Sequence, residues 1–282
     1  MARQQGWTVI LRIEDLDTPR VKPGVIDQTI ETLRWIGIDW DGDPIIQSND
    51  LPHHRLAMEF LADHRLVYPC DLTRSQIESA SSAPNEGDHE TWFDPSLRPA
   101  LIPSVFDDTG TNWRLKVDPG MVAFEDRFVG QQAHDPSKTV GDFVVWTRRK
   151  TPSYQLAVVV DDHRQGVTEI VRSDDLLNST ARQILLQRVL KYLPPPNYTH
   201  LPLVRGPDGR RLAKRHGDTR IDHYRTIGTS PEQIIGLLGH WCGISQTREK
   251  MSAMDFLAGF DLDRLPREDI VLTPEDDQWL SS

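Results

Sequence analysis

Short apolar runs that are typical of strands alternate in this chain with longer segments of helical periodicity. Residues 7–13 (WTVILRI) and 167–171 are predicted to be buried strands, because β-branched residues dominate both. Residues 25–36 carry apolar side chains at a spacing near 3.6, and Gly37 then predicts the helix end. A second helix is expected to start near Pro52. This alternation predicts an α/β protein with a mostly parallel sheet.

Local signals interrupt that alternation. Residues 79–111 contain several prolines and polar residues and show little periodicity, so they are predicted to be an insertion or loop region. Thr73 with Gln76, and Thr180 with Gln183, have the spacing of a capping box. Each pair therefore predicts the start of a helix.

The composition limits the class of protein. The net charge of −10 argues weakly against nucleic acid as a partner, but phosphate binding depends on local clusters of charge. Two cysteines, Cys70 and Cys242, are too few for a disulfide framework and agree with a reducing compartment. No segment approaches the ~18 apolar residues of a membrane span, and the N-terminal apolar run soon meets charged residues, unlike a signal peptide. We therefore expect a cytoplasmic protein without a membrane partner.

An acidic segment, RIEDLD, ends the first predicted strand. Its carboxylates, Glu14, Asp15 and Asp17, lie where α/β folds present ligands. Carboxylates in that place can pair with an amine or hold Mg²⁺. A polar turn is the plainer alternative.

Two further residues stand at the ends of apolar runs. Tyr154 opens the unbroken segment 154–160, where a tyrosine is ordinarily a core residue with its hydroxyl bonded locally. Arg172 follows the strand-like run at 167–171. An arginine in that position is either a salt-bridge partner or a clamp for a carboxylate, since its fork binds two oxygens.

A basic segment, GPDGRRLAKRHGDTR, follows another strand-like run. Its glycines favour mobility and its cations favour phosphate, so we expect a phosphate clamp rather than a solvated loop. The cations of this segment and of the strand before it are Arg205, Arg210, Arg211, Lys214, Arg215 and Arg220. A smaller group, Arg148 to Lys150, is expected to be a solvated loop.

Taken in order, these segments resemble the glutamyl branch of the class I aminoacyl-tRNA synthetases. RIEDLD resembles the RIEDxD segment of that family, and SYQLAVVVDD resembles its tyrosine-led segment. IVRSDDLLNSTARQ resembles the VRGxDLLxST segment, and RRLAKR resembles the KMSKS loop. The match runs from about residue 7 to residue 220 and keeps the order of the family. It implies a Rossmann-like nucleotide-binding fold.

The resemblance implies a role for each matching residue. Glu14 would hold the α-amino group of glutamate, Tyr154 would hydrogen-bond the same substrate, and Arg172 would pair with a substrate carboxylate. Lys214 would be catalytic, since it would reach the ATP phosphates and stabilise the charge that develops as pyrophosphate leaves. The ATP-binding residues of the loop would be Arg211, Leu212, Lys214 and Arg215. Ala213, where the family often has serine, leaves the lysine intact.

The resemblance also implies four ranges. Residues 1–70 would be the first part of the nucleotide-binding domain, and 71–135 an inserted α+β subdomain. Residues 136–222 would be its second part, with the KMSKS-like loop, and 223–282 a short helical region with its clearest helix over 231–241. That region is too short for an anticodon-binding domain. A monomer is expected, because this class needs no partner subunit to build its site.

Three departures from the family are visible. The first strand and helix, with the HIGH-type motif, do not precede RIEDLD, so we expect that Met1 is an internal methionine and that activity suffers without that motif. Cys70 is kept, but Leu72 replaces the second cysteine of the expected zinc-binding pair, so we expect no zinc site. Ser173 stands where the family favours glycine.

The short length resembles the members of the family that attach glutamate to the base queuosine in tRNA(Asp). The expected substrates are therefore L-glutamate, ATP with Mg²⁺, and tRNA. One alternative is a catalytically silent synthetase-like protein that binds tRNA or glutamate. Another, ranked lower, is a fragment of a full glutamyl-tRNA synthetase.

Overall fold

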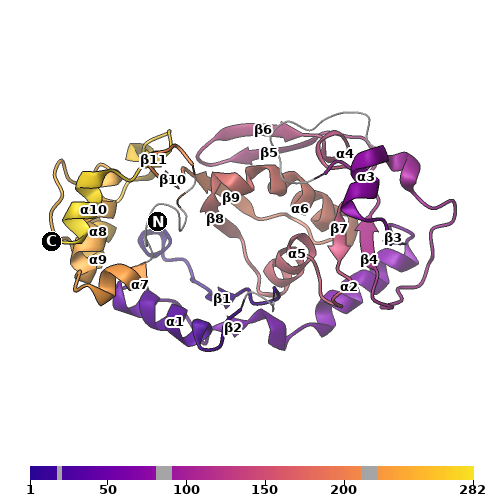
Figure 1. Ribbon diagram of the computed structural model, residues 1–282, viewed down its shortest axis with the longest axis horizontal. Coiled ribbons are helices and arrows are strands. Elements are labelled where there is room, and N and C mark those ends of the chain that lie inside the picture. The colour runs from indigo at the N-terminus through magenta and orange to yellow at the C-terminus, as the bar shows by residue number, and fades with distance from the viewer. Residues whose placement is uncertain (18–20, 81–90, 211, 213–220) are drawn as a thin grey trace. The chain divides into compact units, whose positions relative to one another are not determined.

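The computed structural model describes residues 1–17, 21–80, 91–210, 212 and 221–282. These residues form two compact units, one of residues 49–201 and one of residues 1–48 with 202–282 (Figure 1). Each unit has its own sheets and its own hydrophobic cluster.

The unit of residues 49–201 contains two sheets. The first is antiparallel and consists of β3 (Val67–Cys70), β4 (Asn112–Leu115) and β7 (Val144–Trp146). The second has the order β6-β5-β9-β8, formed by β6 (Gly130–His134), β5 (Val122–Asp126), β9 (Asn197–Leu201) and β8 (Glu169–Ser173). In this sheet β5, β9 and β8 run parallel, and β6 pairs antiparallel with β5.

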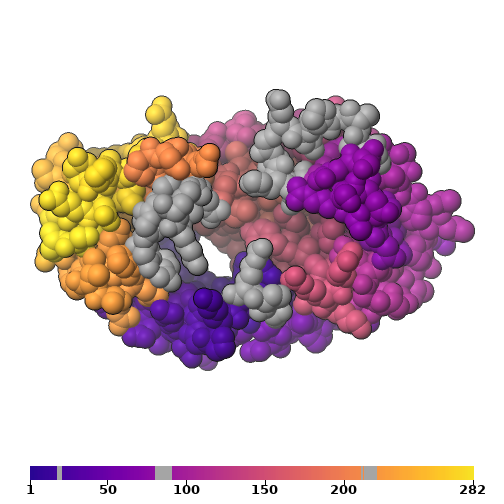
Figure 2. Space-filling view, in the orientation of Figure 1, coloured from indigo at the N-terminus to yellow at the C-terminus, as the bar shows by residue number. Residues whose placement is uncertain are grey.

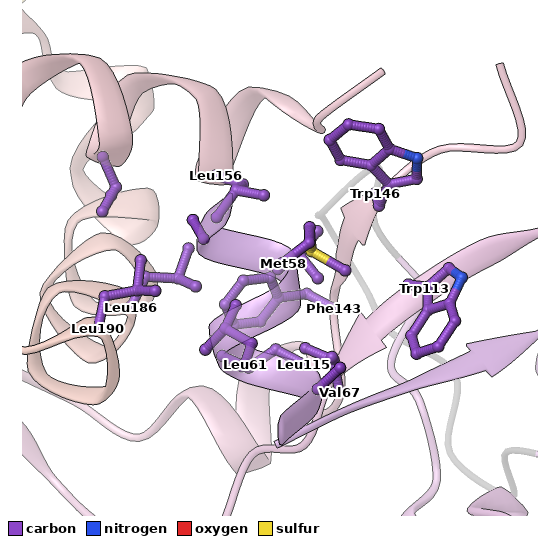
Figure 3. Close-up of a cluster of buried hydrophobic side chains, with 14 of the residues drawn as sticks. Met58, Leu61, Val67, Trp113, Leu115, Phe143, Trp146, Leu156, Leu186 and Leu190 are labelled. Carbon is purple, nitrogen blue, oxygen red and sulfur yellow. The ribbon is translucent and has the colours of Figure 1, made fainter. Parts of the chain in front are cut away.

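Helices of this unit cover the sheets. They are α2 (Pro52–Asp63), α3 (Arg74–Ala80), α4 (Pro136–Thr139), α5 (Tyr154–Arg164) and α6 (Leu177–Leu190), and the 3-10 turn η5 (Asp174–Leu176) leads into α6. The cluster in Figure 3 joins α2, α5 and α6 to the antiparallel sheet through residues such as Met58, Leu115 and Leu156. Helix α3 lies on the surface, in purple in Figure 2, and buries Ile77 beneath it.

The second unit has two short parallel strand pairs. One is β1 (Arg12–Ile13) with β2 (Ile45–Ile46), and the other is β10 (Val204–Arg205) with β11 (Ile270–Val271). Its helices are α1 (Val25–Trp35), α7 (Ile221–Thr226), α8 (Pro231–Trp241), α9 (Ala253–Gly259) and α10 (Pro274–Leu280). A cluster around Ile36, Leu237 and Leu272 packs α1, α7, α8, α10 and β10 together.

Several predictions from local signals are confirmed. Gly37, at a φ of 83°, follows the end of α1, and helices are found from Pro52 and over Pro231–Trp241. Gln76 accepts from the backbone N–H of Thr73, whose hydroxyl accepts from the backbone N–H of Gln76, as a capping box requires.

The predicted buried strands are only partly observed. In residues 7–13 the strand is limited to β1, which pairs with β2 and is half-buried, and Ile10, two residues before it, is 37% exposed. β8 is also half-buried, with Val171 48% exposed, since it is an edge strand among the described residues. Parallel pairing holds for β1 with β2, β10 with β11 and the β5-β9-β8 part of the four-stranded sheet, whereas β3-β4-β7 and the β6-β5 pair are antiparallel.

Two further segments belong to helices α5 and α6. The apolar segment at 154–160 is part of helix α5, and its residues from Gln155 onward are buried on all sides, which removes the usual amphipathic period. The pair Thr180 and Gln183 lies inside α6 rather than at its start, so that capping box is wrong. Residues three apart share one helix face, and here that face turns toward Arg172.

None of the helices in the described part of the chain carries an apolar stretch long enough to cross a bilayer.

Candidate active site

Arg172 lies near the end of β8, and neutral acceptors surround its guanidinium. Its Nε donates to Nε2 of His200 at 2.9 Å, and Nη1 donates to Oε1 of Gln183 at 2.8 Å. Its Nη2 donates to Oγ1 of Thr180 at 2.7 Å and to the carbonyl of Leu176 at 3.3 Å. No carboxylate among the described residues forms an ion pair with it. The salt-bridge interpretation of Arg172 is therefore wrong for the described residues.

Tyr154 begins helix α5, where its side chain is 42% exposed, so it is not a core residue. The next residue, Gln155, is buried, and its Oε1 accepts from Nε2 of Gln183 at 2.9 Å. Gln183 also bonds Arg172, so two hydrogen bonds link the start of α5 to the guanidinium. The structure thus brings the Tyr154 and Arg172 regions together within one unit.

A cavity of about 600 Å³ opens beside Tyr154. Among the described residues its lining includes the cations Arg114, Arg148 and Arg182 and one carboxylate, that of Asp142. Asp142 is itself fully buried and bonded to other groups. A cavity of this size with an excess of cations fits an anionic ligand of small-molecule dimensions.

His200 and Asp126 lie directly behind Arg172 and are fully buried. Nδ1 of His200 is 2.7 Å from Oδ2 of Asp126, and the same carboxylate accepts from the backbone N–H groups of Phe128 and Val129 at 2.9 Å. Burial lowers the pKa of His200 below its ordinary value despite the nearby carboxylate, and the charge of Arg172 lowers it further. Burial also raises the pKa of Tyr198, which stacks on His200, to about 12.

The acidic segment belongs to the other unit. Glu14 follows β1, is exposed, and its Oε1 accepts from Nη2 of Arg12 at 3.1 Å. Asp15 accepts from the backbone N–H of Ser48 at 2.9 Å and from its hydroxyl at 2.6 Å. Asp15 therefore fixes the chain after β2, while Glu14 keeps its second oxygen toward solvent or ligand.

The basic segment is described only at its start. Residues 206–210 form a tight turn, and Arg205 pairs with Asp269. Leu212 is half-buried against the cluster around Ile36. Arg211, Lys214 and Arg215 lie outside the described residues, so their assignment stays a prediction.

The described residues do not fit a metal site built by protein alone. No group of three or more His, Cys, Asp or Glu side chains among them is placed to hold an ion. Cys70 is buried with Tyr68, Ile77 and Phe93, and Leu72 packs against the same cluster. Leu72 therefore contributes to apolar packing at this position.

Sequence reasoning missed the residues that support Arg172. Gln155, Gln183, His200 and Asp126 are buried polar residues of α5, α6, β9 and β5. Buried polar groups are hydrogen-bonded as a rule, but only Gln155 adjoins an unbroken apolar run, so the sequence carried a signal for that residue alone. The partner of each could not be identified, because the contacts join strands and helices far apart in the sequence.

Comparison with known proteins places the chain in a family. Residues 1–271 match the family described as tRNA synthetases class I (E and Q), catalytic domain. A glutamyl-Q tRNA(Asp) synthetase of Rhodopirellula baltica is 45% identical over 83% of this chain and 74% of its own length. The protein of that name from Symbiobacterium thermophilum is 39% identical over 97% of this chain and 88% of its own length.

Longer relatives match over part of their length. A glutamate–tRNA ligase of Azorhizobium caulinodans is 35% identical over 94% of this chain, which spans 56% of that ligase. The crystal structure of glutamate–tRNA synthetase from Elizabethkingia anophelis superposes with a TM-score of 0.79 at 24% identity, over 99% of this chain and 64% of the other. This likeness concerns the fold.

Proposed function

The chain belongs to the class I tRNA synthetases (E and Q), a family of ligases, and from that premise we propose that it activates L-glutamate with ATP and transfers it to tRNA. The observation that carries the proposal is the environment of Arg172. Its guanidinium is held by neutral groups and has no described carboxylate partner, as a binding site for a substrate carboxylate requires.

Arg172 would bind a carboxylate of glutamate from a preorganised position. Four of its five N–H groups already have acceptors, so one N–H of Nη1 remains for the substrate. Arg172 would therefore form a single charge-assisted hydrogen bond with the substrate carboxylate. A bidentate contact would require the carboxylate to displace one of the protein acceptors. Tyr154, exposed at the cavity, would donate its hydroxyl to the same substrate.

Glu14 would accept the α-ammonium group of glutamate, and Arg211, Leu212, Lys214 and Arg215 would contact ATP. In the reaction, an oxygen of the α-carboxylate attacks the α-phosphorus of ATP, and the bond to the bridging oxygen breaks to release pyrophosphate. Lys214 would stabilise the charge of that leaving group. A tRNA hydroxyl then attacks the carbonyl carbon, AMP leaves, and the hydroxyl proton passes to solvent.

Mg²⁺ would be bound largely by the phosphates of ATP, since this ion keeps few protein ligands in such sites. The described carboxylates do not form a set of protein ligands for this ion.

We further propose queuosine in tRNA(Asp) as the acceptor. Two relatives named for that substrate are 39% and 45% identical to this chain and are matched over most of their length. The glutamate–tRNA ligase relative is matched over 56% of its length at lower identity.

Glutamate-dependent exchange between ATP and labelled pyrophosphate, without tRNA, tests the activation step. We expect exchange that is lost in Glu14→Ala and Lys214→Ala. Absence of exchange in a folded sample would favour the silent binding protein. Transfer of labelled glutamate to tRNA(Asp) with and without queuosine tests the acceptor, and equal labelling of both would contradict queuosine.

A further inference from the structure

His200 lies between a buried carboxylate and the guanidinium of Arg172, within the central sheet of residues 49–201. Asp126 on β5 contacts Nδ1, and Arg172 on β8 contacts Nε2, so the imidazole on β9 bridges two neighbouring elements. We propose that His200 is a positioning residue that sets the orientation of Arg172 toward the substrate carboxylate. This inference rests on the proposed function in that Arg172 is taken to bind glutamate.

The protonation of His200 follows from its two partners. A guanidinium can only donate hydrogen bonds, so Nε2, at 2.9 Å from Nε of Arg172, must be an acceptor and carries no proton. The single proton of the neutral ring is then on Nδ1, where it donates to Oδ2 of Asp126 at 2.7 Å. The two contacts therefore require one tautomer of a neutral ring.

Asp126 favours the tautomer of His200 with the proton on Nδ1, and backbone hydrogen bonds fix its carboxylate. Its Oδ1 accepts from the backbone N–H groups of Phe128 and Val129, which fix the carboxylate plane. Its Oδ2 then faces Nδ1 of His200 and also accepts from the backbone N–H of His200 at 3.1 Å. The hydrogen bonds thus run in one direction, from Arg172 through His200 to Asp126.

The neutral imidazole accepts a hydrogen bond from Arg172 without neutralising its positive charge. A carboxylate placed directly on the guanidinium would neutralise it and compete with a substrate carboxylate for the same N–H groups. The neutral ring accepts one bond and fixes the Nε edge, while Gln183 and Thr180 fix the other two nitrogens. The arginine is oriented without being neutralised.

The groups around His200 act in opposite directions on the protonation of its ring. Burial beside Tyr198 and Thr180 opposes protonation of the ring most strongly and the charge of Arg172 adds to it, whereas Asp126 and Asp174 favour protonation. The net direction is a lowered pKa.

Two substitutions at one position separate positioning from packing. In His200→Gln, the side-chain oxygen can reach the place of Nε2 and accept from Arg172. In His200→Asn, the shorter amide can reach Asp126 but not Arg172. In the exchange assay we expect the KM for glutamate to rise about 10-fold or more in His200→Asn and less than about 3-fold in His200→Gln, with the KM for ATP nearly unchanged in both.

Asp126→Asn tests the tautomer itself. The N–H groups of Phe128 and Val129 hold the amide oxygen in the place of Oδ1, so the amide nitrogen faces Nδ1 and forces the proton to Nε2. The Nε2–H of His200 and the Nε–H of Arg172 would then be two donors facing each other. The KM for glutamate should therefore rise as in His200→Asn.

A nitrogen-15 NMR spectrum of the unsubstituted protein at neutral pH gives a readout that does not need activity. It should show His200 protonated at Nδ1, and protonation at Nε2 or at both nitrogens would overturn the proposal. An equal KM in His200→Asn, His200→Gln and the unsubstituted protein would also overturn it, provided that Arg172→Met raises the KM. If Arg172→Met leaves the KM unchanged, the role of Arg172 in the proposed function is what fails.

Discussion

Two buried aspartates in residues 49–201 each support an arginine, but they do so through different contacts. Asp142 accepts directly from Nε and Nη2 of Arg98, both at 2.7 Å. Asp126 reaches Arg172 only through the imidazole of His200. In the first pair the charges cancel, and in the second the cation keeps its charge for another partner.

The surroundings of Asp142 show a structural role. The carboxylate also accepts from the hydroxyl of Tyr68 at 2.5 Å and from the backbone N–H of Val117 at 2.8 Å, so it joins β3 to the chain after β4. Burial and this hydrogen bond raise the pKa of Tyr68. A buried, fully paired carboxylate of this kind holds a sheet together but offers nothing to a ligand.

The largest expected effect is the loss of stability in Arg98→Met. It leaves the carboxylate of Asp142 buried without its cation, which costs about 3–5 kcal/mol of the free energy of unfolding. Arg172→Met removes a cation from neutral partners and should cost about 1–3 kcal/mol. Urea denaturation of both variants tests the contrast, and equal losses would mean that the two aspartates support their arginines in the same way.

Gln183→Leu should have an intermediate effect. It removes the acceptor of Nη1 of Arg172 and leaves Oε1 of Gln155 without its donor, so we expect a loss of about 1–3 kcal/mol. The KM for glutamate should rise as well, because one edge of the guanidinium is released. Gln187→Leu, one turn further along α6, removes a buried amide that does not bond Arg172, so it should leave that KM unchanged and serves as the control for the KM.

The lowered pKa of His200 should make the free energy of unfolding depend on pH. Its folded-state pKa is lowered, so below about 6.5 the unfolded chain binds a proton that the folded protein excludes. Its contribution is complete above that pH and declines as the pH falls toward the folded-state pKa, by up to about 1.4 kcal/mol per pH unit. Urea denaturation at pH 7.5 and 5.5 should show a smaller decline in His200→Gln, and an identical decline would contradict the lowered pKa.

The smallest expected effect belongs to Tyr154→Phe. Tyr154 is exposed at the cavity, so stability should change by less than about 0.5 kcal/mol. Loss of one hydroxyl contact should raise the KM for glutamate about 2- to 10-fold. Tyr192→Phe, whose ring stacks on His163 outside the cavity lining, serves as the control. A KM that rises equally in both variants would remove the role assigned to Tyr154.

Features that depend on neighbouring residues were predictable from the sequence. The capping pair of Thr73 and Gln76 and the helix end at Gly37 are set by contacts within a few residues. The same reasoning failed for Thr180 and Gln183, whose side chains bond Arg172 instead of a helix start. Local spacing does not distinguish a cap from a helix face that serves a distant residue.

The arrangement of the candidate site was not predictable from the sequence. The motif order pointed to Tyr154 and Arg172, and the sequence alone left the partner of Arg172 open. Asp126 and His200 are 74 residues apart and meet through the packing of β5 against β9. Such contacts follow from sheet topology, which no local pattern determines.

The affinity of the protein for L-glutamate, measured by calorimetric titration for the unsubstituted chain, Arg172→Met and Arg98→Met, tests the central claim most directly. Loss of one charge-assisted hydrogen bond should weaken binding about 10- to 100-fold in Arg172→Met. Binding to the folded fraction of Arg98→Met should be unchanged. Equal affinities in the unsubstituted chain and Arg172→Met would contradict the claim that the imidazole of His200 leaves the charge of Arg172 free for the substrate.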